Sequence, residues 1–145
     1  MAKWVMERIV KTPPWCAVAV VLGAAVFLAA CGEKSSKSDA KKAAMALSDY
    51  YYAQWRAPSP DWQVQKVAIA KGNVVTVDTK IISKALSRAI MERSKMEQME
   101  IARLVCPHIN EKIWSKVGKV QPINIRLSGS AGHIINSRCK RPDSE

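Results

Sequence analysis

The side chains best suited to chemistry are two cysteines and two histidines in the second half of the chain. One residue separates Cys106 from His108, and five residues separate His133 from Cys139. Thiolate and imidazole are ligands that zinc and copper accept, so these four residues have the composition of a metal site. An even pair of cysteines in an oxidising compartment normally forms a disulfide instead. Geometry and compartment decide between the two.

The expected geometry argues against a shared metal ion. Residues 133–139 have the pattern of a strand that returns from a loop, which puts His133 near the loop tip and Cys139 further along the strand. At the rise of an extended strand the two positions lie about 20 Å apart. The sequence therefore favours the disulfide Cys106–Cys139, predicts no metal or other cofactor, and predicts about 3–4 kcal/mol of stabilisation from loop closure.

A serine-rich loop is a second candidate for chemistry. It runs from Ser128 to Gly132 and includes Ser130, and His133 follows it directly. A nucleophile elbow needs a turn from strand to helix and a positioned acid, whereas this loop lies between two strand patterns. Serine and glycine are also ordinary turn residues. Because the acidic residues are scattered, we expect no catalytic residues, and a hydrolase built on Ser128 and His133 is the weakest hypothesis.

The N-terminal segment indicates where the chain is sent. Lys3, Arg8 and Lys11 precede an uncharged apolar run at residues 15–30, which is the layout of an export signal. The run is 16 residues long, shorter than the roughly 20 that span a bilayer. It ends in Leu28-Ala29-Ala30-Cys31, and this motif resembles the lipobox of bacterial lipoprotein precursors.

The resemblance implies cleavage between Ala30 and Cys31 and attachment of acyl chains to Cys31, which anchor a protein to a membrane. An uncleaved single-span anchor is the alternative, and either arrangement places the following residues outside the cytoplasm. In the lipoproteins that this motif resembles, an aspartate after the cysteine favours the inner membrane, so the resemblance with Gly32 at this position implies the outer membrane. We expect a domain in the periplasm, an oxidising compartment that suits the disulfide and excludes nucleic acid as a partner.

The exported part is basic. Residues 31–145 hold 20 of the 23 Lys and Arg residues and 11 of the 12 Asp and Glu residues, a net charge of +9. Six basic residues in the C-terminal third form a possible binding surface: Lys112, Lys116, Lys119, Arg138, Lys140 and Arg141. Anionic cell-wall polymer or lipid would fit this charge, although a solvated basic face explains it equally well.

Apolar spacing predicts the elements of the N-terminal half. A helix capped by Asp39 carries an apolar stripe from Ala43 to Trp55 and ends before Pro58. Its aromatic residues offer a platform for a sugar or peptide, but core packing is the preferred interpretation. Residues 62–70 and 74–82 then predict a hairpin around a two-residue turn, Gly72-Asn73. This turn would pair Ala70 with Val75, Ala68 with Val77, and Val64 with Ile81.

The C-terminal half predicts a helix and a second hairpin. Residues 83–105 contain no Gly or Pro and predict one long helix, followed by a short helical turn at residues 110–117. Residues 123–127 alternate apolar and polar side chains, which is typical of a half-buried strand. They would pair with residues 133–139 so that Ile125 faces Ile135.

Together these elements predict a small two-layer α+β domain of order αββα(α)ββ, with antiparallel hairpins covered on one face by helices. We expect residues 1–30 to be a removed signal, 31–42 a flexible polar tether, 43–141 the domain and 142–145 a disordered tail. The first hypothesis for function is a non-enzymatic envelope lipoprotein that binds or scaffolds another envelope component, as accessory subunits of secretion or conjugation assemblies do. The alternative is a basic surface that binds anionic cell-wall polymer or lipid.

Overall fold

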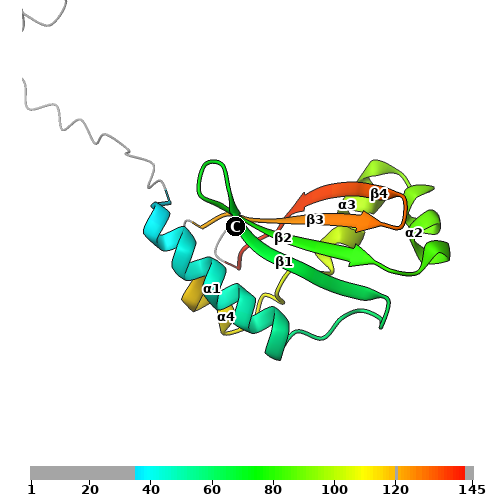
Figure 1. The fold of residues 1–145 in the computed structure, drawn as a ribbon. Helices are drawn as coiled ribbons and strands as arrows, with labels where there is room; N and C mark the ends of the chain where they lie inside the picture. The colour runs from blue at the N-terminus through cyan, green and yellow to red at the C-terminus, as the bar shows by residue number, and fades with distance from the viewer. Residues whose placement is uncertain (1–34, 120, 143–145) are drawn as a thin grey trace, which may run out of the picture. The chain divides into compact units, whose positions relative to one another are not determined.

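The computed structural model describes residues 35–119 and 121–142, and within them four strands form one sheet (Figure 1). The strands, in their order across the sheet, are β1 (Trp62–Ala70), β2 (Val74–Ile81), β3 (Ile123–Gly129) and β4 (Gly132–Arg138). The helices in the same residues are α1 (Lys37–Ala53), α2 (Lys84–Met91), α3 (Lys95–Arg103) and α4 (Ile113–Val117). The predicted α+β class and element order are confirmed. The two hairpins are antiparallel, and β2 pairs with β3 in parallel.

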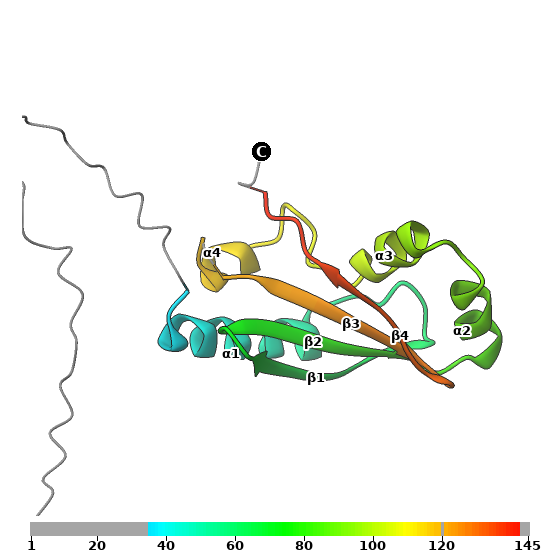
Figure 2. The same ribbon diagram turned by 90° about the horizontal axis from the view of Figure 1, so that it is seen from above.

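One face of the sheet forms the core. Buried side chains alternate with more exposed ones along β2 and β3, and Val75, Val77, Ile123 and Ile125 are almost completely buried. Polar residues such as Asp78 occupy the other face. The α1 and α4 helices lie toward the end of the sheet where β3 begins, whereas α2 and α3 lie toward the end where it stops (Figure 2). No helix in the described part of the chain is long and apolar enough to cross a membrane.

The domain begins earlier than the sequence predicts, so the boundary between tether and domain at residue 43 is wrong. The N-cap of α1 is Ser36, whose hydroxyl accepts from the Asp39 amide at 3.1 Å, and Ala40 is fully buried. Asn73 also donates to the Ser35 carbonyl at 2.9 Å. The polar first turn of α1 resembles a tether in sequence because only one of its residues reaches the core.

Both hairpins differ from the predicted register. A three-residue loop, rather than a two-residue turn, places Ala70 opposite Val74, with positive φ at Gly72 and Asn73. An irregularity between Val64 and Lys66 shifts the pairing further. As a result Val67, rather than Ala68, faces Val77, and Trp62, rather than Val64, faces Ile81.

In the second hairpin the predicted pair is wrong as well. The residue opposite Ile125 is Ser137, and Ile135 lies opposite Leu127. The tighter turn, which pairs Gly129 with Gly132, accounts for one position of this two-position change. The shift in register between Leu127 and Ser128, which adds the buried Ile134 to β4, accounts for the other. The register was predicted from alternation alone, and alternation does not reveal a bulge.

The predicted long helix at residues 83–105 is two helices. Ser94 and Glu97 form a capping box that starts α3. A new helix therefore begins in the middle of a run of good helix formers. The Gln98 side chain is buried at the break and donates to the carbonyls of Met91 and Arg93 at 3.1 and 2.8 Å. These bonds satisfy carbonyls at the end of α2 and let α2 and α3 lie at an angle on the sheet.

Candidate functional site

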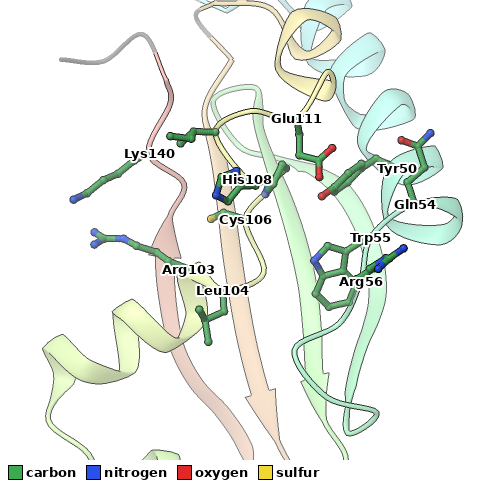
Figure 3. Close-up of a pocket in the computed structure, with 12 residues that line it drawn as sticks. Tyr50, Gln54, Trp55, Arg56, Arg103, Leu104, Cys106, His108, Glu111 and Lys140 are labelled. Carbon is green, nitrogen blue, oxygen red and sulfur yellow. The ribbon is translucent and has the colours of Figure 1, made fainter.

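A cavity of about 480 Å³ lies between the end of α1 and the connection from α3 to α4 (Figure 3). Its apolar wall consists of Tyr50, Trp55, Leu104, Cys106, Pro107 and Ile109. Its polar rim consists of Gln54, Arg56, Arg103, His108, Glu111 and Lys140. Three segments that are distant in sequence therefore build the cavity: residues 50–56, residues 103–111 and the chain that leaves β4.

A disulfide joins two of these segments. Cys106 follows α3, Cys139 follows β4, and their Cα atoms are 5.5 Å apart. The same two cysteines remained for pairing in the sequence once Cys16 and Cys31 were assigned to the signal and the lipid anchor. Because the bond uses both thiols, neither cysteine is free to act as a metal ligand together with His108 and His133. The described residues contain no group of three or more His, Cys, Asp or Glu side chains that could hold a metal ion.

Hydrogen bonds fix the remaining walls of the cavity. The buried Tyr51 hydroxyl donates to the Val105 carbonyl at 2.8 Å and so ties α1 to the connection after α3. Further along, the Trp114 indole donates to the His108 carbonyl at 2.9 Å. The Arg141 guanidinium lies 5.3 Å from the centre of the Trp114 ring. The connection is therefore held from both of its ends.

The cavity combines an apolar interior with a charged opening. Leu104 and Ile109 are each 57 % exposed beside the half-buried Trp55. Burial raises the pKa of the Tyr50 hydroxyl, and the negative charge of Glu111 raises it further, so this hydrogen-bond donor stays protonated to a higher pH than an exposed tyrosine does. In Figure 3, Arg103 and Lys140 lie on the side of β4 and Arg56 on the side of α1. A ligand with an apolar body and an anionic group matches this arrangement.

Two smaller hollows continue from the cavity along α1. One is lined by Ala46, Asp49, Tyr50, Gln54, Lys112, Ile113 and Lys116. The next is lined by Asp39, Lys42, Lys116, Val117, Gly118, Lys119 and Gln121. Neighbouring hollows share residues, first Tyr50 and Gln54 and then Lys116, so the three form one row. We call this row, between one face of α1 and residues 103–121, the α1 seam.

The structure divides the basic residues that the sequence singled out. Four of them line the α1 seam: Lys112, Lys116, Lys119 and Lys140. Arg138 is opposite Asn124 in the sheet and is exposed on the face away from the core, so it does not belong to this surface. Arg141 packs on Trp114 and donates to the Gln121 carbonyl at 3.4 Å.

Sequence reasoning missed three basic residues of the seam, Lys42, Arg56 and Arg103. They lie in α1, just after α1, and at the end of α3, far from the C-terminal cluster in sequence. The apolar part of the cavity was missed for the same reason. One available signal was the triplet Tyr50-Tyr51-Tyr52, because three consecutive tyrosines cannot all face the core. The exposed member is Tyr52, which does not line the cavity, whereas the buried Tyr50 does, so the triplet alone does not locate the site.

The serine loop occupies the turn of the β3–β4 hairpin. The Ser128 hydroxyl donates to the Thr79 carbonyl at 3.2 Å, and His133 shares a hydrogen bond of 3.0 Å with the Asn136 side chain. No carboxylate in the described residues contacts His133. Ser130 is exposed at the tip. Three predicted features lie outside the described residues: lipid attachment at Cys31, cleavage after Ala30, and the end of the tail, residues 143–145.

Comparison with known proteins gives one structural similarity. No family model and no curated protein matches the chain. The fold is similar to the crystal structure of a candidate secreted protein from Pseudomonas aeruginosa, with 11 % sequence identity and a TM-score of 0.48. The similarity covers 73 % of this chain and 94 % of the other.

The Tyr51 bond gives a test of how the site is held. Replacing Tyr51 with Phe leaves the buried Val105 carbonyl without this donor, and we expect a loss of about 1–2 kcal/mol in the free energy of unfolding at neutral pH. Tyr52→Phe, at the exposed neighbour, should change the stability little. Urea unfolding followed by circular dichroism measures both variants.

The same pair of variants predicts a pH effect. Burial raises the pKa of Tyr51 in the folded protein, so its contribution is fully present below about pH 10, the ordinary value. Above that pH the unfolded chain releases the proton first, and the stability falls. The wild type and Tyr52→Phe should therefore lose more stability at high pH than Tyr51→Phe loses. Equal pH dependence in all three proteins would contradict this assignment.

Proposed function

We propose that the protein is a non-enzymatic lipoprotein of the bacterial cell envelope that binds another envelope protein through the α1 seam. The observation that carries this proposal is the seam itself, a row of three hollows with an apolar end and a basic border. A binding surface with a buried apolar anchor site and a polar rim has the usual anatomy of a protein interface. The lipobox motif ending at Cys31 supports the anchor, and the disulfide is of the kind that oxidising compartments allow.

A second candidate function follows from the charge of the seam. Its lining contains seven basic and three acidic residues, so an anionic cell-wall polymer or lipid surface would also be attracted to it. Binding to a polymer or to a bilayer surface would depend on charge alone and would leave the apolar cavity without a role. We therefore place it second.

The anchor is tested by metabolic labelling with an alkyne analogue of palmitate. The wild type should carry the label, and Cys31→Ser should lose it because the thiol that accepts lipid is gone. Cys16→Ser is the matched control, since this cysteine belongs to the segment that is removed, and it should keep the label. Label that persists on Cys31→Ser would refute acylation at this residue.

The seam is tested by photo-cross-linking in the native bacterium. A photoreactive amino acid at Lys112, in the seam, should give a discrete cross-linked product with a single protein. The same amino acid at Lys66, exposed on the opposite face of the sheet, is the control and should give none. Products of equal yield from both positions, or none from Lys112, would argue against the seam as the binding surface. Enrichment of polysaccharide or lipid instead of protein would favour the second candidate.

A further inference from the structure

We propose that the α1 seam binds an acidic peptide segment of its partner, with one large apolar side chain in the cavity at the Trp55 end and carboxylates along the lysines. This inference rests on the proposed function and specifies the chemistry of the partner. Three features of the seam support it: an apolar end, unpaired positive charge, and a length that matches a short segment.

The apolar end has the properties of a site for one anchoring side chain. Leu104 and Ile109 are more than half exposed at the edge of the cavity, and the indole of Trp55 lies between α1 and the α3–α4 connection (Figure 3). The cavity volume of about 480 Å³ falls within the range of small-molecule sites. An inserted Leu, Phe or Trp side chain would cover both exposed residues. Interfaces commonly concentrate their binding energy in such buried anchors.

The remainder of the seam offers positive charge. Lys112 and Lys116 border the middle hollow, and Lys116 and Lys119 border the last one. Among the described residues, ion pairs connect Arg93 with Glu97, Arg103 with Glu100, and Arg126 with Asp78. The seam lysines take part in none of these pairs. Carboxylates of a bound segment would therefore meet lysines that form no ion pair with another described residue.

The length of the seam sets the length of the segment. Its lining on α1 extends from Asp39 to Gln54, which corresponds to about 22 Å at the helical rise of 1.5 Å per residue. An extended chain covers this distance with about seven residues. A peptide of this length would place its apolar anchor at one end and its acidic residues over the two smaller hollows.

The combination of features distinguishes this ligand from two others. A single-chain anionic lipid would fill the cavity but would not use the lysines of the last hollow. An anionic polysaccharide would use the lysines but not the apolar wall. Only a segment that carries both an apolar side chain and several carboxylates engages the whole row.

A random octapeptide library displayed on phage tests the inference on the full-length protein held in phosphatidylcholine nanodiscs. We expect selection of peptides that carry one Leu, Phe or Trp near one end and Asp or Glu at several following positions. A lack of enrichment, or enrichment without an acidic bias, would overturn the proposal.

Synthetic copies of the selected peptides are then titrated by calorimetry. The triple variant Lys112→Gln, Lys116→Gln, Lys119→Gln should weaken binding about tenfold or more, and so should Leu104→Asp, because each removes one half of the recognition. Matched controls are the triple variant Lys66→Gln, Lys80→Gln, Arg138→Gln on the outer sheet face, and the single variant Met96→Asp at an exposed position of α3. These controls should bind as the wild type does. If only one of the two seam variants binds the peptide more weakly than the wild type, recognition by both an apolar and a charged part is refuted.

Two outcomes separate this inference from the proposed function. If Lys112 cross-links to a protein but no acidic octapeptide is selected, the seam is a protein interface and the acidic segment is wrong. If sodium laurate binds the wild type, requires Leu104 and is insensitive to the triple lysine variant, the cavity is a lipid site and the peptide inference is overturned.

Discussion

The disulfide between Cys106 and Cys139 is the constraint on which the rest of the site depends. It joins the chain leaving α3 to the chain leaving β4, and Cys106 itself forms part of the cavity wall. Residues 104–112 contain no extended helix or strand that would hold them by a ladder of backbone hydrogen bonds. Their position relative to α1 is therefore set by side-chain links, chiefly this disulfide and the Tyr51 bond. The α1 seam exists because both links hold the connection against the end of α1.

The sheet supplies the rigid frame to which these links attach. Because only one face of the sheet is buried, α1 and the α3–α4 connection both lie on that side. Ser35, Asn73 and Gln121 form a hydrogen-bonded group that ties the start of α1 to the first hairpin and to the start of β3. The helix is thus fixed at one end by this polar group and at the other by Tyr51. This double attachment holds α1 beside residues 103–121, where the three hollows lie.

The features that the sequence revealed were those encoded by neighbouring residues. Alternation of Ile123, Ile125 and Leu127 identified β3, and the two cysteines left after Cys16 and Cys31 were set aside are the pair that the structure joins. The fold class followed from the order of such patterns. Bulges, by contrast, leave little trace in the pattern, so both hairpin registers were displaced. The capping box at Ser94 can be recognised in the sequence, but the good helix formers on both sides of it led to the prediction of one continuous helix.

The site was harder to predict because its parts are distant in the chain. The opening of the cavity brings Arg56, Arg103 and Lys140 together, and no local pattern relates them. The sequence drew attention to the basic residues of the C-terminal third. Which of these residues share a surface, however, depends on their burial and pairing in three dimensions. Arg138 and Lys140 are two residues apart and would share a face if the strand continued. Because β4 ends at Arg138, the alternation stops there, and the two side chains belong to different faces.

The disulfide positions the connection and thereby the seam, whereas the sheet is held together by its own backbone ladders. Hydrogen exchange followed by mass spectrometry on the oxidised and the reduced protein tests this claim directly. Reduction should accelerate exchange of the amides in residues 104–112 and leave those of β2 and β3 protected. Unchanged exchange in residues 104–112, or loss of protection throughout the sheet, would contradict it.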